Sequence, residues 1–266
     1  MTVYLNGRLL AAATARIDPT DRGFTLGDGL FESIAVRGGQ VRRLTQHLDR
    51  LKNGAEILGL VLPADAKELA NALERVRAAN GVEDGVLRLT LSRGAALRGL
   101  LPAAGTEPTL LITADAGVTD LSPITAITAT VTRRNEHSPL AHIKTINYLD
   151  NILARREAAE KGADEAILLN TAGRLAETTV ANLFMVIGGQ TLTPPVAEGA
   201  LPGVMRADII AAGEAAERPL VADDILRASE AFATNSAGIR GVISVDGRDV
   251  GGGVPGPIFE RLRAMV

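Results

Sequence analysis

The sequence of 266 residues contains no cysteine, and this absence excludes several classes of site. Disulfides, thiolate nucleophiles and cysteine-based metal centres all require that residue. The three histidines, His47, His137 and His142, are scattered without the spacing of metal ligands, so we expect no metal site. The formal net charge of −3 gives no electrostatic basis for binding nucleic acid or an anionic membrane surface.

Long hydrophobic runs are also absent. No stretch approaches the length of a transmembrane helix, and the polar-interrupted start from Met1 to Gly7 lacks the pattern of a signal peptide. We therefore expect a cytoplasmic protein. Hydrophobic residues make up 46% of the chain and charged residues 22%, which is usual for globular proteins. A chain of this length can form one or two domains with a substantial core.

Lysine is scarce, since only four of the 28 basic residues are lysines. Three of them, Lys52, Lys67 and Lys161, lie among charged residues in amphipathic helical patterns. Lys144 instead lies beside Ile143, Thr145 and Ile146, in an irregular segment just before a helical pattern. Apolar surroundings lower the pKa of a lysine and suit it to Schiff-base chemistry. The alternative is an ordinary lysine at a helix start, and local chemistry alone favours that alternative.

The first part of the chain has the pattern of an α+β domain. Asn6-Gly7 is suited to a tight hairpin turn, and the glycines between Asp21 and Glu32 permit positive φ. That glycine-rich stretch is either a pocket-lining loop or a simple connection. Periodicity predicts a hairpin at 3–10, strands at 33–37, 40–42, 86–92 and 109–115, and helices at 44–58 and 65–79. We expect a domain at 1–116, followed by a linker at 117–123.

The second predicted domain spans 124–266. Alternating β-branched residues and glycine turns predict strands at 126–132, 165–170, 174–177, 183–187 and 190–193, and a last hairpin at 243–250. Helical periodicity predicts helices at 148–159, 203–210 and 257–265. We find no internal repeat and no low-complexity tract, so each domain is expected to be an ordinary packed unit.

Several strings occur in one order along the chain: Lys144, Asn147-Tyr-Leu149, Glu177 within Ala-Glu-Thr-Thr-Val-Ala-Asn-Leu-Phe, and Leu201-Pro-Gly-Val-Met-Arg206. Together they resemble the class IV (fold type IV) pyridoxal-phosphate enzymes. That family includes branched-chain and D-amino-acid aminotransferases, (R)-amine transaminases and aminodeoxychorismate lyase. The resemblance runs nearly end to end. It implies an α/β (α+β) fold with a smaller N-terminal α+β domain and a larger C-terminal cofactor-binding domain built on a mixed sheet or barrel.

The resemblance implies pyridoxal 5′-phosphate as the cofactor. Lys144 matches the catalytic lysine that bonds to the cofactor, Glu177 the glutamate that pairs with its pyridine nitrogen, and Tyr148 the tyrosine at its ring oxygen. A guanidinium fork suits phosphate, and Arg50 matches the family's phosphate-binding arginine. The rest of the implied phosphate cup is Val204, Met205, Thr234, Asn235 and Ser236. Taken singly, Arg50 is more commonly an exposed arginine on a helix face, and an exposed strand residue is a plausible alternative for Glu177.

The substrate-binding residues are also implied by the resemblance. Arg98 resembles an arginine that receives a substrate carboxylate in the D-amino-acid and lyase branches, with an exposed loop arginine as the equally weighted alternative. Phe31 and Ala237 complete the implied set. Tyr148 favours transamination, whereas the string that begins at Thr234 resembles the lyase branch, so the two hints conflict.

We therefore expect a homodimeric aminotransferase that moves an amino group between an amino acid, of branched-chain or D type, and a 2-oxo acid, both of them small molecules. The alternative is elimination of pyruvate from aminodeoxychorismate, which gives 4-aminobenzoate. A third interpretation is a non-catalytic protein that binds pyridoxal phosphate. The joint presence of Lys144, Glu177 and Arg50 speaks against it, because a non-catalyst does not need all three.

Overall fold

The computed structural model describes residues 1–265, and the chain folds into two compact units. Unit 1 comprises Met1–Thr119 and Ile143–Asn147. Unit 2 comprises Asp120–His142 and the chain from Tyr148 onward. The segment around Lys144 thus groups with the N-terminal part of the chain, although it follows the predicted linker in sequence. The domain limits predicted from the sequence stay a prediction.

Unit 1 is built on a six-stranded sheet in the order β2-β1-β6-β5-β3-β4. Its strands are β1 (Thr2–Leu5), β2 (Arg8–Ala11), β3 (Gly29–Arg37), β4 (Gln40–Val41), β5 (Gly85–Ser92) and β6 (Thr109–Ala116). All neighbouring strands in this sheet are antiparallel. The first hairpin turns at Asn6 and Gly7, whose φ angles of 45° and 88° are those of the predicted tight turn.

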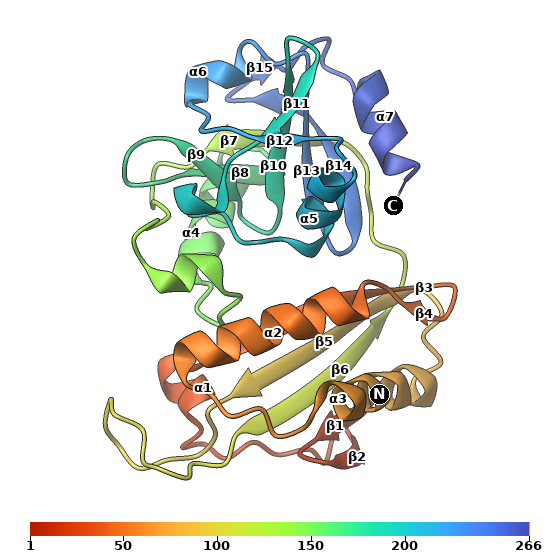
Figure 1. Ribbon diagram of the computed structural model, residues 1–266, viewed down its shortest axis with the longest axis vertical. Coiled ribbons are helices and arrows are strands. Elements are labelled where there is room, and N and C mark those ends of the chain that lie inside the picture. The colour runs from red at the N-terminus through yellow and green to blue at the C-terminus, as the bar shows by residue number, and fades with distance from the viewer. Residues whose placement is uncertain (266) are drawn as a thin grey trace. The chain divides into compact units, whose positions relative to one another are not determined.

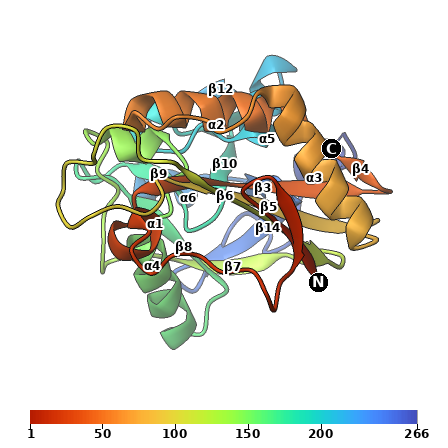
Figure 2. The same cartoon turned by 90° about the horizontal axis from the view of Figure 1, so that it is seen from below.

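Two long helices cover one face of this sheet, α2 (Leu44–Leu58) and α3 (Ala66–Ala79) (Figures 1 and 2). Helix α3 begins at a capping box, because the Asp65 carboxylate accepts from Glu68 N and the Glu68 carboxylate accepts from Asp65 N. Leucines and valines on the inner helix faces pack on the apolar residues that alternate along β5 and β6. Both helices were predicted from their periodicity, whereas the short α1 (Arg22–Leu26) within the glycine-rich stretch was not.

Unit 2 is built on a nine-stranded mixed sheet in the order β12-β11-β10-β13-β14-β7-β8-β9, with β15 paired to β14. The strands are β7 (Ile124–Thr128), β8 (Glu165–Leu169), β9 (Leu175–Thr178), β10 (Asn182–Ile187), β11 (Gln190–Thr193), β12 (Ala216–Glu217), β13 (Glu230–Asn235), β14 (Gly238–Val245) and β15 (Arg248–Asp249). Strand β7 runs parallel to both β14 and β8, and β12 runs parallel to β11. The mixed sheet expected for the C-terminal part is therefore confirmed.

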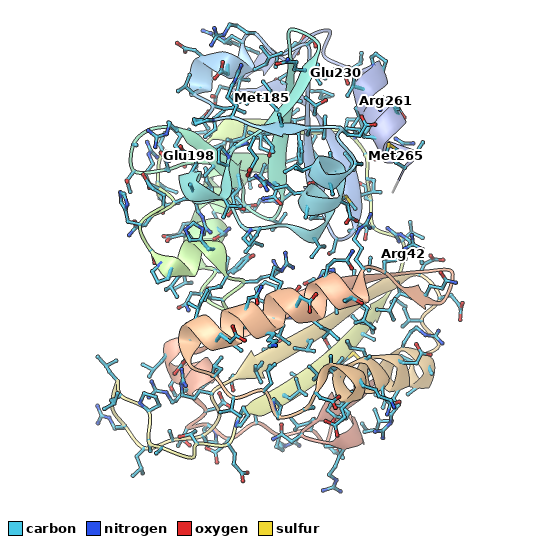
Figure 3. All side chains as sticks on the ribbon, viewed as in Figure 1. Arg42, Met185, Glu198, Glu230, Arg261 and Met265 are labelled. Carbon is cyan, nitrogen blue, oxygen red and sulfur yellow. The ribbon has the colours of Figure 1, made fainter. Side chains whose placement is uncertain are left out.

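The helices of unit 2 are α4 (Leu149–Glu160), α5 (Val204–Ala211), α6 (Ala222–Ile225) and α7 (Pro257–Arg263), with short 3-10 turns at Pro139–His142 and Val196–Glu198. Helices α5 and α7 pack on an apolar cluster that includes Phe184, Phe232 and Phe259. The first two rings stack with centroids 5.2 Å apart. The buried carboxylate of Glu230, labelled in Figure 3, accepts hydrogen bonds from two backbone N–H groups in the first turn of α7.

Across residues 1–265, no helix has both the length and the apolar composition needed to cross a membrane.

Candidate active site

Lys144 lies on a short extended segment that pairs with the start of β3. Phe31 N donates to Lys144 O at 2.9 Å, and Ile146 N donates to Gly29 O at 3.1 Å. These bonds fix the backbone on both sides of the lysine. The Lys144 Nζ atom lies 4.4 Å from the centroid of the ring of Phe31, a buried residue. The structure thus brings together two residues predicted from the sequence, Lys144 and Phe31.

Arg88 on β5 is a neighbour of this pair that the sequence analysis missed. Its Cζ atom lies 3.8 Å from the centroid of the Phe31 ring. Alternation along β5 was the available signal: Leu87 and Leu89 are fully buried, so Arg88 must point away from the apolar core. Two cationic side chains at one aromatic ring give this face of unit 1 a positive character, which suits an anionic ligand.

Arg50, predicted to bind phosphate, is held by a buried carboxylate. Its Nε donates to Glu32 Oε1 at 2.8 Å and its Nη2 to Glu32 Oε2 at 2.5 Å. His47 Nδ1 lies 2.6 Å from Glu32 Oε2. This cluster fixes the direction of the Arg50 side chain on α2. Its phosphate-binding role stays a prediction.

The pKa values of the Glu32 and His47 side chains follow from this cluster. Burial opposes ionisation of Glu32, but hydrogen bonds from Arg50 and His47 outweigh burial and lower its pKa below the ordinary value. Burial lowers the pKa of His47, and the positive charges of Arg50 and Lys144 act in the same direction against the hydrogen bond to Glu32. Glu32 is therefore ionised and His47 neutral near pH 7.

Arg98 lies on the exposed loop between β5 and β6, at the rim of a cleft of about 870 Å³ within unit 1. The loop is held by Arg22, which is buried and donates to Gly99 O and Leu100 O at 2.7 Å each. Arg22 Nε is in turn held by Asp28 Oδ2 at 2.8 Å. The residues that line this cleft do not include Lys144, Phe31 or Arg50, so the cleft does not bring Arg98 together with them. The carboxylate-binding role of Arg98 stays a prediction.

Glu177 on β9 is held through both carboxylate oxygens by residues of unit 2. Arg134 Nη2 lies 3.1 Å from Glu177 Oε1, and Leu201 N donates to Glu177 Oε2 at 3.0 Å. The glutamate is buried, so it is not the exposed strand residue that the sequence allowed as an alternative. The sequence analysis did not single out Arg134, because nothing in its spacing distinguishes it from Arg133 beside it.

The start of α5 has the features of an anion site. Its N-cap is Gly203, which has no side chain to cap the helix. The first N–H groups of α5 therefore lack a side-chain cap and lie at the positive end of the helix dipole. Asn182 Nδ2 donates to Leu201 O at 2.8 Å and fixes the approach to the helix. A Cβ atom at Gly203 would lie 1.9 Å from Asn182 Oδ1, so this close approach requires glycine.

Thr234 adds a hydroxyl to this region. It lies on β13 directly opposite Asn182 on β10, and α5 packs against β13. Thr234 is 1% exposed, and its Oγ1 has no hydrogen-bond partner among the described residues. A buried hydroxyl without a partner costs free energy unless a ligand or water completes it. Thr234 therefore fits a ligand with acceptor oxygens.

The remaining predicted residues of unit 2 lie in two turns. Asn235, Ser236 and Ala237 form the turn between β13 and β14, where Ala237 N donates to Asn235 Oδ1 at 2.9 Å. Tyr148 is the N-cap residue of α4. Within unit 2, the segment from Leu201 to Val204 has the Glu177 carboxylate at one end and the uncapped start of α5 at the other. A fixed carboxylate suits the ring nitrogen of pyridoxal phosphate, and an uncapped helix start suits its phosphate. The residues present therefore fit that cofactor.

Comparison with known proteins supports this interpretation. Residues 29–245 match the model of the family described as amino-transferase class IV. A provisionally assigned branched-chain-amino-acid aminotransferase of Methanocaldococcus jannaschii is 33% identical over 271 residues, which cover 99% of this chain and 94% of that protein. D-alanine aminotransferase of Bacillus licheniformis is 30% identical over 276 residues, which cover 100% of this chain and 96% of that protein.

Solved structures show the same fold. The branched-chain amino acid aminotransferase of Escherichia coli is similar with a TM-score of 0.93 and 28% identity, covering 98% of this chain and 91% of that one. A provisionally assigned 4-amino-4-deoxychorismate lyase of Legionella pneumophila is similar with a TM-score of 0.88 and 31% identity, covering 96% of this chain and 95% of that one. The architecture is thus that of the fold type IV aminotransferase structures, as the resemblance implied.

Proposed function

The chain belongs to the class IV aminotransferase family, whose members are enzymes that depend on pyridoxal phosphate, and from this premise we propose which reaction it carries out. The proposed reaction is transfer of an amino group between an amino acid, of branched-chain or D type, and a 2-oxo acid. The observation that carries the proposal is the pairing in unit 2 of Glu177, held at both oxygens, with the uncapped start of α5 and the Thr234 hydroxyl, which has no partner within residues 1–265.

Pyridoxal phosphate supplies an electron-accepting ring that stabilises negative charge on the substrate α-carbon. In our proposal, Glu177 accepts the hydrogen bond of the ring nitrogen and keeps that nitrogen protonated. The first N–H groups of α5, at Val204 and Met205, bind the phosphate together with Thr234 and the turn residues Asn235 and Ser236. Arg50 adds a charge-assisted contact to the phosphate.

Lys144 has two tasks in this proposal. Its Nζ atom would hold the cofactor in the resting enzyme. Once a substrate amine has displaced it, the free Nζ atom would move a proton between the substrate α-carbon and C4′ of the cofactor. Tyr148 contacts the ring oxygen of the cofactor. The substrate is bound by Phe31, Arg98 and Ala237, with a carboxylate at Arg98. Arg88, which contacts the Phe31 ring, adds positive charge on the same side of the sheet of unit 1.

The second candidate function is elimination of pyruvate from aminodeoxychorismate. It is favoured by the string Thr234-Asn-Ser-Ala-Gly238, which resembles the lyase branch, and by the structural relative from Legionella pneumophila. A homodimer and a cytoplasmic location also stay proposals.

A substrate panel on the purified holoenzyme separates the two reactions. We expect turnover of branched-chain or D-amino acids only when a 2-oxo acid is supplied, because amino transfer needs an acceptor to complete its cycle. The lyase instead releases pyruvate and 4-aminobenzoate from aminodeoxychorismate without an acceptor. Fast acceptor-independent pyruvate release with negligible transamination would replace the leading function with the second one.

A further inference from the structure

Arg134 forms an ion pair with the Glu177 carboxylate within unit 2. Its Nη2 lies 3.1 Å from Glu177 Oε1, in a setting where the side chain of Arg134 is 18% exposed and that of Glu177 7% exposed. Because both side chains are largely shielded from water, the attraction between the two charges is only weakly screened. Each charge also offsets the free-energy cost of burying the other.

The guanidinium is itself fixed from several sides. Arg134 Nη2 also donates to Ala141 O at 3.1 Å, and Nε donates to Gly199 O at 3.2 Å. The backbone is fixed as well, because Arg134 N donates to Leu169 O at 2.8 Å at the end of β8. The arginine therefore lies in a rigid frame and presents one nitrogen to the glutamate.

The two oxygens of Glu177 have different partners. Arg134 pairs with Oε1, and Leu201 N donates to Oε2. A carboxylate oxygen has two acceptor positions, so these two contacts alone do not use up the acceptor capacity of the group. Fixing both oxygens sets the plane of the carboxylate, and the direction in which it can accept a bond from a ring nitrogen is set with it.

We propose that Arg134 is a positioning residue that orients Glu177 toward the ring nitrogen of the cofactor. This inference rests on the proposed role of Glu177. Arg134 does not touch the substrate or the cofactor in this proposal, and it acts only through the glutamate. Loss of the arginine should therefore weaken the part of cofactor binding that depends on the ring nitrogen, and leave the part that depends on the phosphate and the aldehyde.

The test compares two ligands of the apoprotein, pyridoxal phosphate and its 1-deaza analogue, in which the ring nitrogen is replaced by a C–H group. Both carry the same aldehyde and phosphate. The measured quantity is the ratio of their dissociation constants, from fluorescence or calorimetric titration. In the wild type we expect the natural cofactor to bind more tightly. In Arg134→Gln the ratio should fall by about tenfold, as expected for loss of one charge-assisted contact, while the affinity for the analogue changes little.

Matched variants make the outcome decisive. Glu177→Gln should reduce the ratio as Arg134→Gln does. Arg174→Gln removes an arginine of unit 2 that pairs with a different buried glutamate, Glu198, and should leave the ratio as in the wild type. If Arg134→Gln does not fold, Arg134→Lys keeps the charge but not the fork, and its ratio should still fall by at least about threefold.

The possible failures are distinguishable. If the wild type binds both ligands equally, the proposed role of Glu177 is wrong. If the wild type discriminates and Glu177→Gln does not, while Arg134→Gln keeps the wild-type ratio, the role of Arg134 is wrong and that of Glu177 stands. A merely structural role of Arg134 would weaken both ligands to the same extent and leave the ratio unchanged.

Discussion

At the scale of single residues, Lys144 differs from the other three lysines in its surroundings. Lys52, Lys67 and Lys161 are exposed, whereas Lys144 is partly buried and lies against the Phe31 ring. Reduction of the holoenzyme with borohydride and peptide mapping should place the pyridoxyl group on Lys144. Lys144→Ala should remove the label while the apoprotein stays folded. A label on any of the three exposed lysines would contradict the assignment.

Single residues also show where sequence reasoning stops. Lys144 and Glu177 could be selected because they occur in a known order with the strings around them. Arg88 and Arg134 could not be selected in that way, because the chain contains many arginines. Alternation along β5 gives only the face of the sheet on which Arg88 lies, and Arg134 has no informative spacing at all. Arg88 is identified by its Cζ atom, 3.8 Å from the centroid of the Phe31 ring, and Arg134 by its Nη2 atom, 3.1 Å from Glu177 Oε1. Such contacts join distant parts of the sequence and form only on folding.

At the scale of elements, the loop between β5 and β6 depends on a small polar cluster. Asp28 Oδ2 accepts from Arg22 Nε at 2.8 Å and from Arg93 Nε at 2.7 Å. Burial opposes ionisation of Asp28, but hydrogen bonds from Arg93 and Arg22 outweigh burial and lower its pKa below the ordinary value. Arg22 then holds Gly99 and Leu100 at the tip of the loop.

We expect Arg22→Ala to release this loop. The loss of two hydrogen bonds from a charged donor should raise the population of the open loop by about tenfold or more. Because Arg98 lies on the loop, limited digestion with trypsin should then cut after Arg98 faster by a similar factor, as measured from the fragment masses. Arg16→Ala is the control, since Arg16 donates to neighbouring exposed carbonyls and should not change the rate. An equal rate in the wild type and Arg22→Ala would show that Arg22 does not hold the loop.

Most elements could be predicted, but their partners could not. Periodicity located the long helices α2 and α3, and the glycine pairs located the hairpin turns, because both signals are local. The bridge between Leu30 and Thr145 joins segments far apart in sequence, and no local pattern identifies such a pair. The same holds for β7, whose parallel pairing with β14 depends on packing of the whole of unit 2.

At the scale of the whole molecule, periodicity predicted the elements, and the family resemblance predicted how they are arranged. Composition and pattern indicated an α+β protein with a boundary near residue 120. The mixed sheet of the C-terminal part was predicted from the family. The grouping of Ile143–Asn147 with unit 1 was outside both kinds of reasoning. That segment is too short to carry a periodic signal, and its place is set by hydrogen bonds to Gly29 and Phe31 on β3.

The buried cluster of Glu32, His47 and Arg50 predicts how the stability of the molecule depends on pH. The pKa of His47 is lowered in the folded state from an ordinary value of 6.5, so below pH 6.5 the unfolded chain binds a proton that the folded chain does not. Protonation therefore favours unfolding as the pH falls. The pKa of Glu32 is lowered from 4.5, so its contribution is complete above pH 4.5 and is lost as the pH falls toward the folded pKa.

His47→Gln should remove the first of these two effects. We expect the free energy of unfolding of the wild type, relative to that of the variant, to be constant above about pH 7 and to decrease below pH 6.5 by at most about 1.4 kcal/mol per pH unit, the value for one proton. Urea unfolding of the apoprotein, followed by circular dichroism from about pH 5 to pH 8, measures this difference.

The difference at pH 8, where His47 is neutral in both states, gives the part of the free-energy cost of the substitution that does not depend on pH. A difference that stays constant down to pH 5 would mean that His47 has the same pKa in the folded and unfolded chains. Burial and the charges of Arg50 and Lys144 would then not keep it neutral against the effect of Glu32.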